Sequence, residues 1–155
     1  MVLVNRLFTS FVSLSLLAGL QPLQAQKENP FGTVTAFFEA FHQKDSTALQ
    51  AFFDPKAQMS LTRENEDGSP VKHHIAFDDF VRRVCQRPDQ PQWEERLGTP
   101  SVTVHQNLAT VWVPFSFYLD DQLSHTGFNL FQLYWDGLRW KILFLADTRT
   151  SNRKI

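Results

Sequence analysis

A histidine and an asparagine share one face of a predicted strand with large apolar side chains. Residues 124–135 alternate between two faces, and one face carries His125, Gly127, Asn129, Phe131, Leu133 and Trp135. A histidine that faces an apolar cavity can act as an acid or a base near neutral pH. The pattern therefore predicts a pocket wall with His125 as its titratable group. The alternative is a half-buried histidine with a structural role at the end of the strand.

An aspartate and an arginine follow the apolar run of residues 138–145. Alternation places Asp147 and Arg149 on the face of Leu143 and Leu145, and it places Trp140, Ile142, Phe144 and Ala146 on the opposite face. A buried, unpaired carboxylate is costly, so Asp147 needs a partner. His125 on the adjacent strand would form an acid–base dyad with Asp147, whereas Arg149 would form a structural ion pair with it.

The spacing of the histidines does not favour a metal site. His73 and His74 are adjacent on a predicted strand and point to opposite faces, and none of the five histidines has a local chelating spacing. The chain also has no glycine-rich phosphate loop. We therefore expect neither a metal nor a cofactor.

Three strand-like runs must position these residues. They span residues 101–119, 124–135 and 138–149, and they are separated by Asp120-Asp121 and by Asp136-Gly137, which are turn signals. Amphipathic helices are predicted over residues 31–41, 47–53 and 76–86, with a short hairpin at residues 58–63 and 71–75. This order predicts an α+β fold in which three N-terminal helices pack on a strongly curved antiparallel or mixed sheet.

The first 25 residues have the layout of a secretory signal peptide. Arg6 precedes an apolar run at residues 7–20, and a polar stretch ends at the small residue Ala25. We expect export to the periplasm or beyond, and a single domain over residues 26–155. The apolar run is short for a membrane span, so stable membrane insertion is not expected after its removal. An uncleaved anchor is the alternative.

Composition limits the class of partner. The 155 residues include 15 Phe and 4 Trp, and the formal net charge is −1 without a basic stripe. The electrostatic requirement for nucleic-acid binding is therefore unmet. Cys85 is the only cysteine, so no internal disulfide can form, and we expect it to be a small buried residue.

Two segments resemble a known family. Residues 37–57, FFEAFHQKDSTALQAFFDPKA, resemble the opening helices of nuclear transport factor two-like domains. The C-terminal part is similar to the closing strands of exported bacterial members labelled SnoaL-like or lumazine-binding, through Phe131-Gln132-Leu133, Trp140-Lys141-Ile142 and residues 146–149. The resemblance implies a cone-shaped, cystatin-like α+β barrel. This scaffold hosts isomerases, dehydratases, cyclases, transport adaptors and ligand binders. Ketosteroid isomerase relatives use a tyrosine of the first helix and two carboxylic acids, and here that helix has phenylalanines and no tyrosine.

Three functional hypotheses follow. The first is an exported domain that binds a small apolar or aromatic molecule, with contacts from Trp112, Tyr118, Asn129, Phe131, Arg149, His73 and Phe38. The second is an isomerase, dehydratase or cyclase in which His125 and Asp147 act as an acid–base pair and Asn129 or Tyr118 stabilises an oxyanion. The third is a structural homodimer or partner-binding module that uses the outer face of the sheet.

Overall fold

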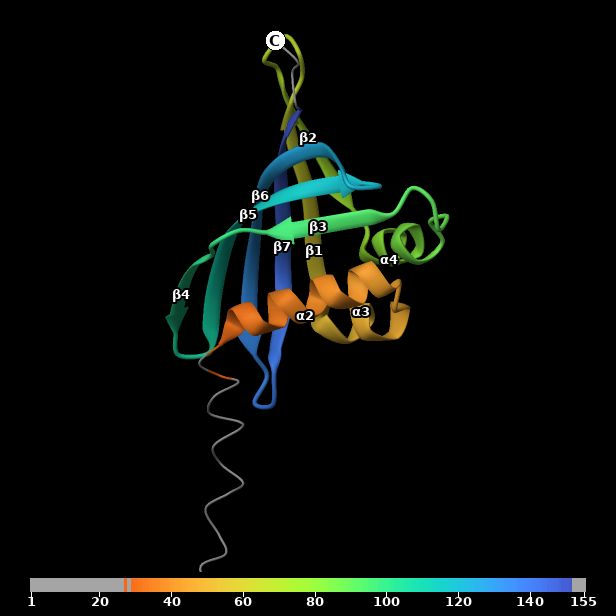
Figure 1. Ribbon diagram of the computed structural model, residues 1–155. Coiled ribbons are helices and arrows are strands. Elements are labelled where there is room, and N and C mark those ends of the chain that lie inside the picture. The colour runs from red at the N-terminus through yellow and green to blue at the C-terminus, as the bar shows by residue number, and fades with distance from the viewer. Residues whose placement is uncertain (1–26, 28, 152–155) are drawn as a thin grey trace, which may run out of the picture.

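The computed structural model describes residue 27 and residues 29–151, so the predicted signal peptide lies outside the described residues (Figure 1). The helices are α2 (Pro30–Gln43), α3 (Ser46–Phe52) and α4 (Phe77–Cys85). The strands are β1 (Phe53–Glu64), β2 (Pro70–Ile75), β3 (Trp93–Leu97), β4 (Ser101–His105), β5 (Leu108–Leu119), β6 (Gln122–Trp135) and β7 (Trp140–Ser151). None of the helices in this described part is long and apolar enough to cross a membrane.

The seven strands form one mixed sheet with the order β2-β1-β7-β6-β5-β3, and β4 also pairs with β5. Strands β1 and β7 are parallel, and every other pair is antiparallel. The sheet is strongly curved but does not close into a barrel, and the three helices pack on its concave side (Figure 1). The predicted α+β class with three helices on a curved sheet is confirmed.

Capping residues fix the ends of the first two helices. The side chain of Asn29 accepts a hydrogen bond from the Gly32 N–H at 3.0 Å, and that of Asp45 accepts one from the Ala48 N–H at 2.9 Å. Helix α2 ends at Lys44, whose φ of 57° is left-handed. These caps fix the ends of the helix that carries an aromatic stripe, which consists of Phe37, Phe38 and Phe41.

Aromatic packing joins this stripe to the sheet. The Phe37 ring lies 5.8 Å from the Phe131 ring of β6 and 6.0 Å from the Phe80 ring of α4, measured between centroids. Phe37 and Phe131 are fully buried. Leu133, Trp140 and Ile142 are also fully buried and belong to the same hydrophobic core. Burial of such rings supplies most of the stabilisation between the helices and the sheet.

Two predictions about the strands are wrong in detail. Residues 101–119 form two strands rather than one, because the chain reverses at Gln106, whose φ is 55°. In β7 the register shifts between Ile142 and Phe144, so Leu143 is an extra residue. This bulge turns Trp140 and Ile142 inward, on the face of Leu145 and Asp147, whereas strict alternation predicts them on the opposite face.

A glycine allows a close approach of three strands. A β-carbon at Gly127 of β6 would lie 1.9 Å from the Thr148 carbonyl oxygen of β7 and 2.8 Å from the Phe115 ring of β5. No larger residue fits there without displacement of the backbone. Gly127 therefore lets the Phe115 ring lie against the middle of β6, between His125 and Asn129.

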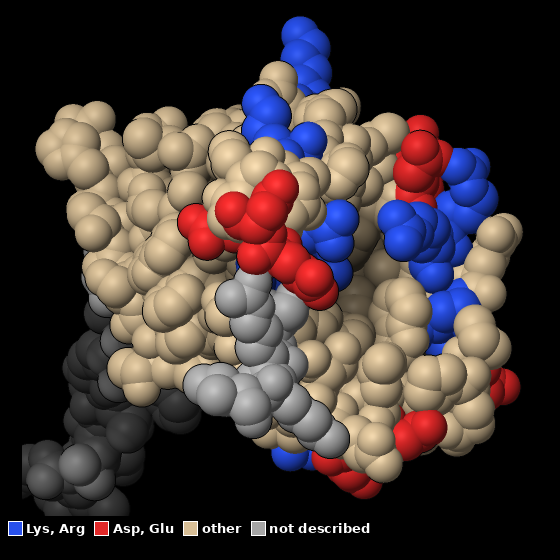
Figure 2. Space-filling view, turned by 90° about the horizontal axis from the view of Figure 1, so that it is seen from above, with Lys and Arg blue, Asp and Glu red and all other residues tan. Residues whose placement is uncertain are grey.

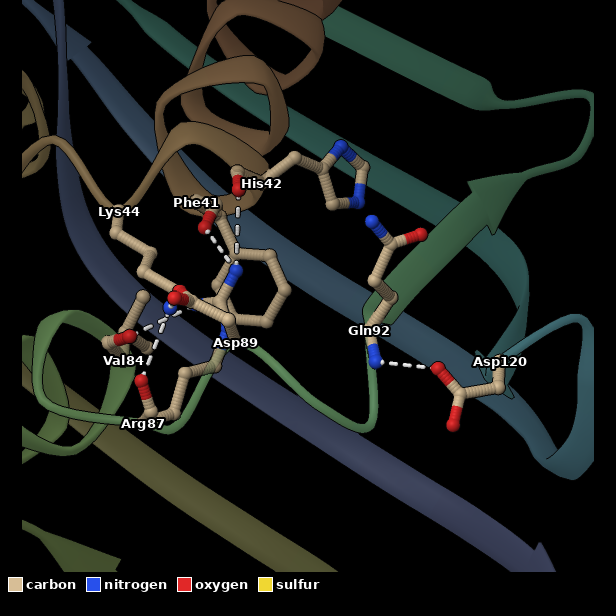
Figure 3. Close-up of polar contacts among 8 residues, drawn as sticks. All are labelled: Phe41, His42, Lys44, Val84, Arg87, Asp89, Gln92 and Asp120. Atoms are coloured by element: carbon tan, nitrogen blue, oxygen red, sulfur yellow. Dashed lines mark hydrogen bonds and ion pairs between the residues drawn. The ribbon is translucent and has the colours of Figure 1, made fainter.

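Buried Arg87 ties the ends of α2 and α4 together (Figure 3). Its guanidinium donates to the carbonyl oxygens of Phe41, His42 and Val84 at 2.9, 3.1 and 2.8 Å, and it lies over the Trp93 ring at 5.2 Å. These carbonyls belong to the last turns of the two helices, where regular intrahelical partners run out, although Phe41 also accepts from the Lys44 N–H at 3.3 Å. Arg87 thereby fixes the segment that leads into β3.

The outer face of the sheet carries an exposed aromatic pair. Trp112 and Phe128 stack at 5.1 Å between centroids, and they are 42% and 39% exposed. A second subunit on this face stays a prediction.

Replacement of Arg87 by Met is expected to lower the free energy of unfolding by about 3 kcal/mol, because three carbonyl groups lose the Arg87 donor and, among the described residues, only that of Phe41 keeps another, the Lys44 N–H. The measurement is urea denaturation at pH 7. Arg82→Met is the matched control: Arg82 is exposed and forms an ion pair with Asp79 on α4, so its loss should change stability by less than about 1 kcal/mol. Equal effects of the two substitutions would show that Arg87 does not hold the helix ends.

Candidate functional site

A cavity of about 510 Å³ lies between the helices and the concave face of the sheet. Its aromatic walls are Phe37, Phe38, Phe41, Phe80, Trp93 and Phe117, and its polar groups are Ser60, Glu95, His125, Asn129, Asp147 and Arg149, with Arg83 at the exposed rim. Seen from above, the surface is hollowed near the middle, and Lys and Arg side chains gather on the side where α4 lies (Figure 2). The cavity therefore combines aromatic walls with polar and charged groups from β1, β3, β6 and β7.

Glu95 of β3 is the acidic group most strongly affected by this environment. Asn129 Nδ2 donates to Glu95 Oε1 at 2.6 Å. Burial raises the pKa of Glu95 to about 7, and the nearby Asp147 charge adds to the rise, while the Asn129 hydrogen bond and Arg149 act in the opposite direction. Glu95 can thus gain or lose a proton near neutral pH.

The backbone of Glu95 is held by helix α2. Its N–H donates to His42 Nε2 at 2.9 Å, so the proton of the neutral imidazole is on Nδ1. Burial lowers the pKa of His42, which keeps this nitrogen available as an acceptor. Because Arg87 binds the His42 carbonyl oxygen, the α2 end, β3 and Glu95 form one connected unit.

Asp147 of β7 forms an ion pair with Arg149. The Arg149 Nε and Nη2 atoms donate to Asp147 Oδ2 at 3.1 and 2.9 Å. The other oxygen, Oδ1, is buried without a hydrogen-bond partner among the described residues. Burial raises the pKa of Asp147, and Arg149 partly offsets this rise. One oxygen of this carboxylate therefore has no donor among the described residues.

His125 of β6 is neutral at pH 7. Its ring stacks on Phe117 at 4.9 Å between centroids, and its Nδ1 lies 3.1 Å from Ser124 Oγ. Burial, together with the Arg149 charge, lowers the pKa of His125 to about 4. Asp147 accepts hydrogen bonds from Arg149, and the His125 ring lies next to Ser124 Oγ. The predicted dyad between His125 and Asp147 is therefore not formed.

The structure brings most of the predicted site residues together. His125, Asp147, Asn129, Arg149 and Phe38 line the cavity. Phe131 is fully buried beneath it, 6.1 Å from the Phe38 ring between centroids. The sequence-based grouping of these six residues around one concave surface therefore matches their placement.

Three other predicted contacts lie elsewhere. Trp112 and Tyr118 are on the convex face, because alternation along β5 turns Val111, Val113, Phe115 and Phe117 inward. Tyr118 lies under the Arg96 guanidinium at 4.1 Å. His73 is exposed on β2, where it pairs with Leu61, and it does not line the cavity.

Sequence reasoning missed Glu95 and His42. A signal for Glu95 existed, because Trp93, Glu95 and Leu97 alternate along one short strand and place a carboxylate between two apolar residues. His42 falls at the end of α2, and no local pattern shows that its ring nitrogen binds the backbone of a distant strand.

The described residues contain no group of three or more His, Cys, Asp or Glu side chains that could hold a metal ion. Cys85 is half-buried, and burial raises the pKa of its thiol. It therefore has the character of a packing residue rather than that of a reactive thiolate.

Comparison with solved structures shows the fold. No family model matches the sequence, and no curated protein matches it. An NTF2-like protein with a cystatin-like fold from Novosphingobium aromaticivorans is 12% identical, with a TM-score of 0.65 over 94% of this chain and 95% of the other. An NTF2-like protein from Cytophaga hutchinsonii is 11% identical, with a TM-score of 0.62 over 81% of this chain and 98% of the other.

A third similar structure is described as a proposed dehydratase of the NTF2-like family from Streptomyces avermitilis. It is 13% identical, with a TM-score of 0.58 over 82% of this chain and 97% of the other. At these identities the likeness shows the fold alone. The chain has the NTF2-like, cystatin-like fold that the resemblance implied.

Glu95→Gln is expected to remove a pH dependence of stability. The Glu95 carboxyl has a pKa of about 7 when folded, against an ordinary value of 4.5. The folded state therefore binds this proton more tightly, so stability falls as pH rises from about 4.5 to about 7 and is constant above that range. The loss amounts to at most about 3 kcal/mol. Urea denaturation across this range measures it.

The quantity to compare is the difference in unfolding free energy between wild type and Glu95→Gln. This difference cancels the contributions of His42 and His125, whose lowered pKa values act in the opposite sense: their contribution is lost as pH falls below 6.5. Parallel pH curves for the two proteins would contradict the raised pKa of Glu95.

Proposed function

We propose that this protein binds a small apolar or aromatic molecule in the cavity between the helices and the sheet. The observation that carries the proposal is the combination of six aromatic side chains with a few convergent polar groups in a space of about 510 Å³. Cavities of about 300–1,000 Å³ with this composition are typical of small-molecule sites. The predicted signal peptide leads us to propose that binding takes place outside the cytoplasm.

The arrangement of the core supports an open binding site rather than a filled cone. Along β6, Leu133 and Phe131 are fully buried in the core, and Asn129 and His125 then line the cavity. Apolar side chains fill the space next to Leu133 and Phe131, and polar side chains surround the space that remains next to Asn129 and His125. A ligand would place its apolar body against the rings and its polar group near Glu95, Asn129 and Asp147.

Leu61→Trp is expected to weaken binding by at least about tenfold, because the larger ring occupies part of the cavity. Leu61 lines the cavity from β1, directly beside Asp147 on β7. Binding of the neutral fluorescent probe N-phenyl-1-naphthylamine measures the effect, and mass spectrometry of natively purified protein identifies any retained ligand. Thermal unfolding checks that the variant folds.

Trp112→Ala is the matched control, because Trp112 lies on the convex face and should not affect the probe. Absence of probe binding to wild type, or equal loss in both variants, would contradict a ligand site in the cavity.

Acid–base catalysis is a second candidate function, of the isomerase, dehydratase or cyclase type. It is favoured by Glu95, whose carboxyl faces the cavity with a pKa of about 7, the value at which a group both donates and accepts protons at neutral pH. Asn129 orients this carboxyl, and Asp147 lies across the cavity wall on β7. Glu95 replaces His125 as the acid–base candidate, because His125 is too weak a base at a pKa of about 4.

A substrate-independent experiment tests this candidate. Small-molecule extracts are incubated with wild type and with Glu95→Gln, and the products are compared by mass spectrometry. Catalysis by Glu95 predicts compounds whose abundance changes with wild type and changes at least about 100-fold more slowly with the variant. Identical product profiles would remove Glu95 as a catalytic residue.

A further inference from the structure

Two acidic side chains line this cavity, and each has an oxygen without a hydrogen-bond partner among the described residues. Asp147 Oδ1 is buried and unpaired, while its Oδ2 accepts from Arg149. Glu95 Oε1 accepts from Asn129, and no other hydrogen bond joins the Glu95 carboxyl to a described residue. Each carboxyl therefore retains one acceptor oxygen that the described side chains leave unused.

The side chains around these two carboxyls do not supply the missing donor. Arg149 is 43% exposed and is oriented to Asp147 Oδ2, and Arg83 lies at the exposed rim on α4. His125 on β6 is neutral, and His42 on α2 is used by the Glu95 backbone. Asn129 is already hydrogen-bonded to Glu95, and the Ser60 hydroxyl of β1, which also lines the cavity, forms no hydrogen bond with either carboxyl.

The aromatic walls of the same cavity suit a cation. Phe38, Phe41, Trp93 and Phe117 all line the space that contains the two carboxyls. The faces of aromatic rings attract ammonium groups, and this attraction increases when water is excluded. The carboxyls supply the hydrogen-bond acceptors and the rings supply a surface for the apolar part of the ligand.

We propose that the ligand of this cavity is an apolar or aromatic amine, bound as its ammonium form, with its N–H groups donating to the carboxyls of Asp147 and Glu95. This inference rests on the proposed binding function and specifies its ligand class. An ammonium group relieves the repulsion between the two carboxylates, which a neutral ligand cannot do. A carboxylate ligand would add a third negative group to the same cavity.

The proposal has a consequence for pH. Glu95 binds a cation best when it is ionised, so amine affinity rises as pH increases from about 6 to about 8, by up to about tenfold. An aliphatic amine remains protonated throughout this range, because its pKa is close to that of Lys. His125 and His42 have lowered pKa values and are largely neutral above pH 6.5, and the other charged side chains that line the cavity are Arg83 and Arg149.

The experiment compares three probes that share one ring system: 2-naphthylmethylamine, 2-naphthylmethanol and 2-naphthoate. Calorimetric titration of the full chain at pH 6 and pH 8 gives six dissociation constants. The expected result is that the amine binds at least about tenfold more tightly than the alcohol at pH 8, and that only the amine gains affinity from pH 6 to pH 8. Equal or tighter binding of the alcohol or of the naphthoate overturns the amine inference.

Asp147→Asn identifies the acceptor. It should reduce amine affinity at least about tenfold and leave the alcohol within about threefold. Asp89→Asn is the charge-matched control, because it removes one negative charge from an exposed residue that contacts Lys44 outside the cavity. Equal effects of both substitutions on the amine overturn the inference. Should Asp147→Asn not fold, Glu95→Gln replaces it, and persistence of the pH dependence in that variant overturns the inference.

The same titrations separate this inference from the proposed function. Absence of binding by all three naphthyl probes, with N-phenyl-1-naphthylamine still bound, overturns the amine inference and leaves a ligand site in place. Absence of binding by every probe overturns both.

Discussion

The packing of α2 on the concave face of the sheet is the interaction on which the rest of the structure depends. Phe37 joins rings from α2, α4 and β6 in one cluster, and Arg87 ties the carbonyl ends of α2 and α4 to the segment before β3. The ring cluster around Phe37 fills part of the space between the helices and the sheet with apolar side chains. Arg87 places β3 at the edge of the cavity. Without both, Glu95 would not face Asn129, and the cavity would have no fixed polar wall.

The polar groups of the cavity have a consistent electrostatic pattern. Burial favours the neutral forms of Glu95, His125 and His42, which raises the pKa of the acid and lowers those of the two histidines. Burial also raises the pKa of Asp147, and the hydrogen bonds from Arg149 partly offset this rise. Glu95, with a pKa of about 7, changes its protonation close to neutral pH, which makes it the centre of any acid–base or charge-dependent function.

The sequence was sufficient for the fold class, and it named five of the residues that line the cavity. Period-two alternation placed His125 and Asn129 correctly on β6, because that strand is regular over this stretch. It failed in β7, where the extra residue Leu143 inverts the faces on its two sides. Trp112 and Tyr118 were assigned to the site for their chemistry, although their position in the alternation of β5 turns them outward. A bulge depends on pairing with neighbouring strands, so local sequence does not determine it.

Glu95 shows why the polar centre of the site required the structure. Within β3 it is one of two adjacent glutamates, and Glu94 pairs with Arg96 at the surface while Glu95 faces the cavity. What distinguishes them is contact with residues far along the chain: His42 at the backbone, Asn129 at the carboxyl and Asp147 by charge. Similar structures share the fold at 11–13% identity. A shared fold at this level of identity does not imply that the same side-chain contacts are present. The function of this chain therefore depends on the specific side chains that surround Glu95 rather than on the scaffold alone.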